Sequence, residues 1–212
     1  MDFLRMNSTT GYFISFLISI FSPMLLIIWY IRNTGKRDAF LFHEINLKIW
    51  ILSFLLCISI FLLLIAFKGR PIMVMHKNEI PYLIYLLGPL LCSPVIEEII
   101  FRGLLLKQLL LKIIPWISIV ITSILFALPH FSSFERILNA LLCGIVLGFI
   151  YYKTDKLVVC ILFHSLFNVL TSITGFINNY SLTLQISSFI LAITLSIFAI
   201  RGFCKNRYIE NK

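Results

Sequence analysis

Six polar side chains lie inside long apolar runs of the sequence, where ionisable groups are costly and usually serve a function. They come from three separate runs, so that three different segments of the chain would have to bring them together. A cluster of carboxylates, imidazoles and a carboxamide could carry out acid–base chemistry on a bound substrate. The six residues are Glu97, Glu98, Arg102, His130, His164 and Asn168.

Helical spacing divides the charged residues of the first run into two groups. Glu98 and Arg102 are four residues apart, which places a carboxylate and a guanidinium on one helix face. Glu97 is turned about 100° away from Glu98 and is free to face something else. We therefore predict that Glu98 and Arg102 form a buried structural pair and that Glu97 is the reactive carboxylate. His164 and Asn168 share one face, one turn apart.

Two kinds of chemistry fit this set of residues. A carboxylate and an imidazole can deprotonate a water molecule, while a second imidazole and an amide stabilise an oxyanion on a carbonyl group. Alternatively, Glu97, His130 and His164 match a common zinc ligand set, with water in the open position. The zinc-protease motif HExxH is absent from the sequence. The residues alone leave both mechanisms open.

The composition indicates the type of protein that positions these residues. Of the 212 residues, 60% are hydrophobic and 13% are charged, whereas soluble domains are about 45–50% apolar and about 25% charged. The net charge is +9, but the basic residues form no dense stripe, which excludes nucleic acid as an expected partner. The five cysteines are scattered without a CxxC pair, so we expect neither a disulfide framework nor a thiol nucleophile. The composition therefore predicts a helical membrane protein.

The apolar runs predict an all-α, polytopic transmembrane bundle of seven spans, with the active site inside the membrane. Pro89 and Pro94 could break the third span, which would make eight. We expect one integral-membrane domain over residues 1–212, because no linker or repeat interrupts it. A β-barrel is not expected, since the runs do not alternate. The predicted spans are Gly11–Ile31, Ile49–Phe67, a run from Pro81 to Ile96 that then becomes polar, Pro115–Pro129, Ile137–Tyr152, Leu157–Phe176 and Ser181–Ile200.

Counting along these spans at 1.5 Å per residue predicts that the polar groups meet. Measured from the Lys107–Pro115 turn, Glu97 lies about 15 Å deep and His130 about 22 Å deep. Measured from Lys156 at the same face, His164 and Asn168 lie about 12 and 18 Å deep. We therefore expect them to converge near the middle of the membrane.

The distribution of basic residues predicts the orientation of the chain. With seven spans, five basic residues fall on one side: Arg5, Lys68, Arg70, Lys77 and Arg136. Twelve fall on the other: Arg32, Lys36, Arg37, Lys48, Lys107, Lys112, Lys153, Lys156, Arg201, Lys205, Arg207 and Lys212. The second side is expected to be cytoplasmic, in a multi-pass protein of the cell membrane with its N-terminus outside and its C-terminus inside.

Three motifs in order resemble the CPBP intramembrane proteases, also called the Abi or CAAX protease and bacteriocin-processing family. They are EExxxR at Glu97, FxxxH at Phe126 and HxxxN at His164. The family includes the eukaryotic type II CAAX prenyl endopeptidase, and the resemblance covers about residues 81–176. Gly144 and Gly148 also look like the family.

This resemblance implies a role for each motif residue. Glu97 with His130 would activate water, His164 and Asn168 would bind the oxyanion, and Glu98 and Arg102 would support the site. Members have been described as metalloproteases, yet the glutamate mechanism needs no metal, so zinc at Glu97, His130 and His164 stays open. The eukaryotic relatives open towards the cytosol, whereas the basic residues place this site nearer the outer face.

The resemblance implies an endopeptidase that cleaves near the C-terminus of a membrane-associated peptide or lipidated protein within the lipid bilayer. In a chain of this composition, processing of a peptide pheromone or bacteriocin, or self-immunity, is more plausible than CAAX-like cleavage of a prenylated protein. A non-catalytic regulatory or immunity protein with the same fold is the alternative, although every motif residue is present. An ion-coupled transporter is less favoured, because the sequence shows no inverted repeat.

Overall fold

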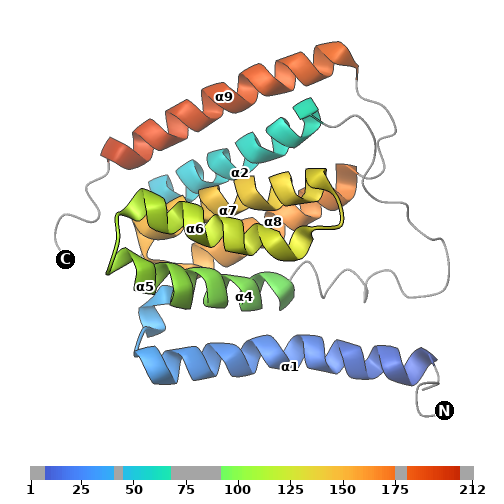
Figure 1. Ribbon diagram of the computed structural model, residues 1–212, viewed down its shortest axis with the longest axis vertical. Coiled ribbons are helices and arrows are strands. Elements are labelled where there is room, and N and C mark those ends of the chain that lie inside the picture. The colour runs from blue at the N-terminus through green and yellow to red at the C-terminus, as the bar shows by residue number, and fades with distance from the viewer. Residues whose placement is uncertain (1–7, 41–44, 68–91, 175–180, 206–212) are drawn as a thin grey trace.

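The computed structural model describes residues 8–40, 45–67, 92–174 and 181–205, and these residues contain helices and no β-strand (Figure 1). The all-α prediction is therefore confirmed over this part of the chain. The long helices are α1 (Ser8–Thr34), α2 (Leu47–Phe67), α6 (Pro115–Ala127), α7 (Phe134–Thr154), α8 (Leu157–Thr174) and α9 (Leu182–Lys205). The shorter ones are α4 (Ser93–Glu98), α5 (Lys107–Leu110), the 3-10 helices η1 (Arg37–Phe40) and η4 (Leu128–His130), and the π-helix η3 (Ile99–Leu106).

The two adjacent glutamates lie near the start of a helix that α4, η3 and α5 form without interruption. It runs from Ser93 to Leu110, a length of about 27 Å at 1.5 Å per residue. Pro94 lies in its first turn, where a proline removes no helical hydrogen bond. The predicted third segment is apolar to Ile96 and then carries Glu97, Glu98 and Arg102 before Lys107, and the described helix covers this polar part. The beginning of that span, residues 81–91, lies outside the described residues.

A helix covers at least part of every other predicted span. Three described helices are long and apolar enough to cross a membrane, namely α2, α7 and α9, while α8 and the segment from Pro115 to His130 are shorter apolar helices. Apolar side chains on the outer helices face outward; Leu25 of α1 and Phe198 of α9 are 66% and 63% exposed. Such a surface suits lipid and not water. A helical membrane protein is supported, and the count of seven spans stays a prediction.

Helix α2 lies at the centre of the packing that surrounds the site. It contacts α7, α8 and α9, and α6 packs on α7. In Figure 1, α1 and α9 lie on opposite outer sides, with the motif-bearing helices between them. The apolar core includes Leu56, Ile150 and Val159, each at most 2% exposed. The motifs therefore lie on helices that are held on several sides.

The basic residues gather at one end of the bundle. The end of α1, the start of α2, the α5–α6 turn, the α7–α8 turn and the end of α9 all lie at this end (Figure 1). The segment after α1 and the α7–α8 turn are joined directly, because Lys36 Nζ lies 2.5 Å from Asp155 Oδ2. Of the twelve basic residues predicted to share a face, only Arg207 and Lys212 fall outside the described residues. The others lie at this end of the bundle, and the membrane topology stays a prediction.

Helices α6 and α7 pack closely because small residues face each other. Gly144 and Gly148 lie four apart on α7, and a Cβ atom added to Gly144 would lie 3.0 Å from Ser123 Cβ and 3.1 Å from Ser123 Cα. A Cβ atom on Gly148 would lie 3.1 Å from Ile119 Cγ2. Small residues allow helix backbones to approach in membranes. This approach brings the Gly144 carbonyl within reach of the site described below.

Gly144→Ala is expected to destabilise the protein by about 1–3 kcal/mol, because overpacking a tight contact forces the helices apart. The cost is measured as a lowered midpoint of thermal unfolding in detergent. Ser123→Gly removes the Cβ atom that the new methyl group meets, so the double variant should recover part of the loss. Equal stability of Gly144→Ala and wild type would contradict the close packing.

Candidate active site

A buried ion pair lies at the base of the site. Arg102 Nη1 donates to Glu98 Oε1 at 2.7 Å, and the two side chains are 2% and 0% exposed. The same guanidinium donates through Nη2 to the Gly144 carbonyl at 3.2 Å and lies 4.6 Å from the centroid of the Phe126 ring. The pair predicted from the four-residue spacing is therefore present. Arg102 also connects its own helix to α6 and α7.

His164 lies between the two adjacent glutamates. Its Nδ1 atom is 2.8 Å from Glu98 Oε1, the same oxygen that accepts from Arg102. Because an ionised carboxylate paired with an arginine can only accept hydrogen bonds, Nδ1 carries the proton and donates. The other ring nitrogen, Nε2, lies 3.8 Å from Glu97 Oε2. Glu98 thus fixes the orientation of the imidazole that faces Glu97.

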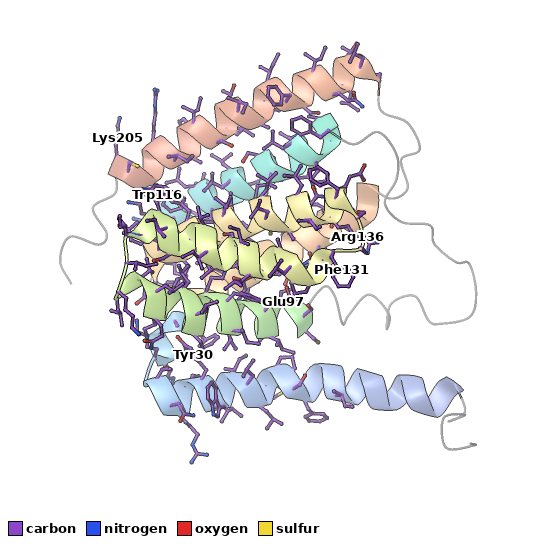
Figure 2. All side chains as sticks on the ribbon, viewed as in Figure 1. Tyr30, Glu97, Trp116, Phe131, Arg136 and Lys205 are labelled. Atoms are coloured by element: carbon purple, nitrogen blue, oxygen red, sulfur yellow. The ribbon has the colours of Figure 1, made fainter. Side chains whose placement is uncertain are left out.

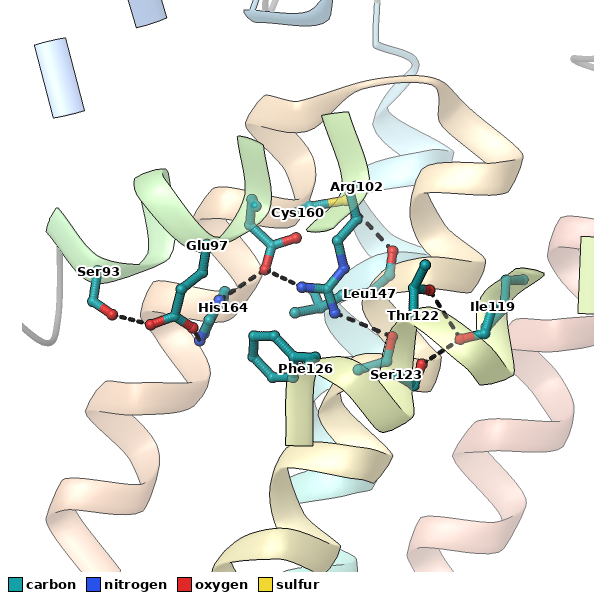
Figure 3. A network of polar contacts seen from close by, with 12 residues as sticks. Ser93, Glu97, Arg102, Ile119, Thr122, Ser123, Phe126, Leu147, Cys160 and His164 are labelled. Carbon is teal, nitrogen blue, oxygen red and sulfur yellow. Dashed lines mark hydrogen bonds and ion pairs between the residues drawn. The ribbon is translucent and has the colours of Figure 1, made fainter. Parts of the chain in front are cut away.

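Glu97 is the more accessible of the two carboxylates. Its side chain is 26% exposed, against 0% for Glu98. Ser93 Oγ, one turn earlier, donates to Glu97 Oε1 and leaves Oε2 directed towards His164 (Figure 3). A gap of 3.8 Å between two polar atoms is one that a water molecule can bridge. Ser93 thus holds one oxygen of the Glu97 carboxylate, and the other oxygen is available to a water molecule.

His130 is held at the end of its helix by the backbone. Helix α6 ends at Ala127, and the 3-10 turn Leu128–His130 follows, with Pro129 inside it. His130 Nδ1 lies 3.1 Å from the Phe126 carbonyl, which can only accept, so Nδ1 is the donor. With Nδ1 as the only protonated nitrogen of a neutral ring, Nε2 carries a lone pair that can accept a proton.

The Phe126 ring lies between the two imidazoles and the guanidinium. Its centroid is 5.4 Å from that of His130 and 5.6 Å from that of His164, the latter in an edge-on arrangement. The ring is 2% exposed, and Figure 3 shows it beside Arg102 and His164. Phe126, the first residue of the FxxxH motif, therefore packs against His130, His164 and Arg102 and helps to position their side chains.

A cavity of about 250 Å³ opens beside these residues. His130, His164 and Asn168 line it together, so three of the predicted site residues share one space. The rest of the wall combines apolar side chains of α2, α7 and α8 with several polar groups. The apolar ones include Leu63, Leu64 and Phe167, and the polar ones include Glu135, Arg136 and Asn139.

The structure brings the motif residues together in an arrangement that differs in part from the expected one. The resemblance pairs Glu97 with His130, whereas the imidazole that contacts Glu97 in the described residues is that of His164. Sequence reasoning missed the contact between His164 and Glu98, and it also missed Ser93. The Ser93–Glu97 contact has a local signal, since the two residues are four apart on one helix. The His164–Glu98 contact has none, because it joins two helices.

The proposed zinc ligands do not form a compact set. Among the described residues, no three side chains of His, Cys, Asp or Glu come close enough together to hold one metal ion. One ring nitrogen of each histidine is already occupied, by the Phe126 carbonyl for His130 and by Glu98 for His164. Zinc ligation by Glu97, His130 and His164 therefore stays a prediction, and the chemistry below uses protein groups alone.

Comparison with protein families supports the resemblance that the motifs carry. A family model described as type II CAAX prenyl endopeptidase Rce1-like matches residues 79–170. The matched segment contains all three motifs and covers less than half of the 212 residues. No curated protein matches the chain, and no solved structure matches it. Residues 79–170, the segment that builds the site, are therefore similar to this family.

Proposed function

We propose, from the match of residues 79–170 to the type II CAAX prenyl endopeptidase family, that the chain is an intramembrane endopeptidase that uses water activated by Glu97. The match supports protease activity in general. The observation that carries the mechanism is the contact between Glu97 and His164, beside a cavity that His130 and Asn168 also line. Each step of hydrolysis can be assigned to one of these groups.

Glu97 is the general base. Its Oε2 atom takes a proton from a water molecule, and the oxygen of that water forms a bond to the carbonyl carbon of the substrate. His130 lines the cavity beside Glu97. The lone pair of its Nε2 atom would orient the water molecule by accepting a hydrogen bond from the second hydrogen of that water. When the tetrahedral intermediate collapses, the carbon–nitrogen bond breaks, and protonated Glu97 gives its proton to the leaving amine.

His164 and Asn168 are proposed to stabilise the oxyanion. With His164 protonated on both nitrogens, the formal charges of Glu97, Glu98, Arg102 and His164 sum to zero, which suits a cluster with little exposure to water. Nε2 of His164 would then donate to the oxygen of the intermediate. The Asn168 carboxamide lines the same cavity one turn along α8 and can supply a second donor.

The surroundings of the cavity favour a membrane-associated substrate. Leu63, Leu64 and Phe167 form an apolar wall. Phe131, in the turn that follows His130, and Phe134, the first residue of α7, are 80% and 78% exposed, and exposed apolar side chains of this kind suit contact with a membrane. The substrate class is therefore a hydrophobic or lipidated peptide. Processing of a pheromone or bacteriocin, or self-immunity, is the proposed role.

The direct test of this function is cleavage by the purified protein in liposomes. Wild type should hydrolyse a hydrophobic, liposome-bound peptide and should keep its activity after metal ions are removed with a chelator, because the proposed mechanism uses protein groups alone. His130→Gln should lower the rate by about 10²-fold or more. Loss of activity on chelation, restored by zinc, would instead support the metal mechanism. A lack of cleavage, with an intact immunity phenotype in Glu97→Gln, would favour the non-catalytic alternative.

We also propose that the basic end of the bundle faces the cytoplasm, since basic residues are retained on that side. The site would then open nearer the outer face, because His130 and Arg136 lie towards the opposite end, as the positions of Arg136, Trp116 and Lys205 in Figure 2 show. The prediction is tested in a Cys92→Ser/Cys204→Ser background, in which the remaining cysteines, Cys57, Cys143 and Cys160, are buried.

Two exposed positions report the orientation, one at each end of the bundle. A membrane-impermeant thiol reagent added to intact cells should label Ser132→Cys, at the site end. It should label Lys112→Cys only after permeabilisation. The opposite pattern would place the site towards the cytoplasm, as in the eukaryotic relatives.

A further inference from the structure

Two lysine side chains lie side by side at the basic end of the bundle. Lys36 follows α1, Lys107 is the first residue of α5, and their ammonium groups are close enough to interact directly. Burial and the neighbouring charge of Lys36 lower the pKa of Lys107 to about 8. Because like charges at short range repel each other, this arrangement favours the binding of a negatively charged group beside the two lysines.

One carboxylate balances only part of this charge. Asp155 Oδ2 lies 2.5 Å from Lys36 Nζ, and the Lys36 and Asp155 side chains remain 34% and 46% exposed. Among the described residues, no carboxylate lies within ion-pair distance of Lys107. With both lysines protonated, the three side chains carry a formal charge of +1. A ligand that approaches from outside can therefore reach an excess of positive charge.

A buried hydroxyl group adjoins the same side chains. The Tyr151 ring is 2% exposed, and its hydroxyl lies near Tyr30 and Asp155. In the described part of the chain this hydroxyl has no hydrogen-bond partner, which is costly for a buried polar group. The Tyr30 hydroxyl is already used, because it donates to the Gly103 carbonyl at 3.3 Å between α1 and η3 (Figure 2). The Tyr151 hydroxyl can still donate one hydrogen bond to an oxygen of a bound anion.

Local contacts hold the backbone that carries Lys36. Thr34 Oγ1 accepts from the Lys36 backbone N–H at 3.2 Å, and Gly35 between them adopts a left-handed conformation with φ of 66°. In η1, which follows, the Phe40 ring packs edge-on against Tyr30 with 5.8 Å between the ring centroids. Helix η1 also contacts α8. Because the segment is already ordered, a ligand at Lys36 loses little affinity to the ordering of the chain.

An exposed apolar face of α1 leads to this end of the bundle. Leu25, Ile28 and Trp29 share one face of the helix and are 66%, 50% and 48% exposed. Tryptophan is enriched where a membrane meets water, and Trp29 lies five residues before the end of α1 at Thr34, a distance of about 7.5 Å. An acyl chain can lie along this face while its headgroup reaches Lys36. The surroundings therefore favour a lipid over a free ion.

We propose that Lys36 and Lys107 bind the phosphate group of an anionic phospholipid, with the Tyr151 hydroxyl as a further donor and the acyl chains along α1. Asp155 competes with the phosphate for Lys36 and limits the affinity. The bound lipid joins the segment after α1 to α5 and to the α7–α8 turn, so that it stabilises the packing of α1 on the bundle. The proposed hydrolysis gives these residues no role, and the inference does not depend on it.

The test measures thermal unfolding of the purified full chain in a neutral detergent, with phosphatidylglycerol or phosphatidylcholine of identical acyl chains added. Phosphatidylglycerol should raise the unfolding midpoint of wild type by about 5 °C more than phosphatidylcholine does. Lys36→Gln/Lys107→Gln should abolish this difference, and Lys36→Arg/Lys107→Arg should keep most of it. Arg201→Gln/Lys205→Gln, which removes two exposed charges from the same end, is the matched control and should respond as wild type does.

Three results would overturn the inference. They are equal shifts with the two lipids, a lipid difference that survives in Lys36→Gln/Lys107→Gln, and a difference that the control variant also loses, since the last would reflect total charge and not a site. An equal shift with inorganic phosphate alone would contradict the lipid assignment. If Lys36→Gln/Lys107→Gln does not fold, Asp155→Asn decides. It removes the competing carboxylate and should enlarge the lipid difference, so an unchanged or smaller difference would count against the site.

Discussion

Replacing Glu97 with glutamine is expected to lower peptide cleavage by about 10²- to 10⁴-fold, the range in which a positioned general base contributes. Glutamine keeps the shape of the side chain and an oxygen that can accept from Ser93 Oγ. It cannot take a proton from water. The fold should therefore survive while the rate falls, and both are measured on the same preparation, by cleavage in liposomes and by thermal unfolding.

Asp155→Asn is the matched control for this variant, because it also replaces a carboxylate with a carboxamide. Asp155 lies at the basic end and adopts a left-handed backbone conformation with φ of 51°, which asparagine tolerates well. Its cleavage rate should stay near that of wild type. Full activity in a well-folded Glu97→Gln protein would show that Glu97 is not the base.

The largest loss of stability is expected from Arg102→Met. The change leaves the Glu98 carboxylate, 0% exposed, without its arginine, and breaking a buried pair in this way costs about 3–5 kcal/mol. The midpoint of thermal unfolding in detergent should fall by about 10 °C. Arg201→Met, at an exposed position of α9, should leave the midpoint nearly unchanged.

A second substitution distinguishes loss of the charge pair from loss of packing. Glu98→Gln removes the charge that Arg102→Met would leave alone, while its oxygen can still accept from His164 Nδ1. The double variant should therefore be more stable than Arg102→Met. If the two changes simply add, the energy of the site lies in the contacts of Arg102 with Phe126 and Gly144 and not in the ion pair.

The sequence predicted those parts of the site that depend on one helix. The Glu98–Arg102 pair follows from four-residue spacing, and the predicted span Pro115–Pro129 ends close to the end of α6 at Ala127. The sequence also predicted that the three motifs lie close together, because the helical rise per residue fixes how far each motif lies along its helix. Contacts between helices could not be predicted in this way. Whether Glu97 faces His130 or His164 depends on how each helix is rotated about its axis, and tertiary packing decides that rotation.

The helix that carries Glu97 and Glu98 also shows the difference between what one segment of sequence predicts and what packing between helices decides. The apolar run from Pro81 to Ile96 becomes polar at Glu97, and the sequence predicts that the charged residues still lie at membrane depth. The described helix carries them without interruption from Ser93 to Leu110, because Glu98 and Arg102 neutralise each other and the packed helices shield them. Hydropathy counts each residue alone and therefore ends a span where a pair of charges begins. Arg136 was counted only as a loop charge, since nothing in its neighbours indicates a cavity.

The position of Arg102 has a consequence for a protein that works in bilayers of different thickness. Its guanidinium touches Glu98 on its own helix, Phe126 on α6 and Gly144 on α7, and Glu98 extends this contact to His164 on α8. Helices adapt to a thinner or thicker bilayer chiefly by tilting. Four helices joined at one level can tilt about that level, so that their ends move further than the reacting atoms. We therefore expect these contacts of Arg102 to keep the distance between Glu97 and His164 nearly constant when the helices tilt.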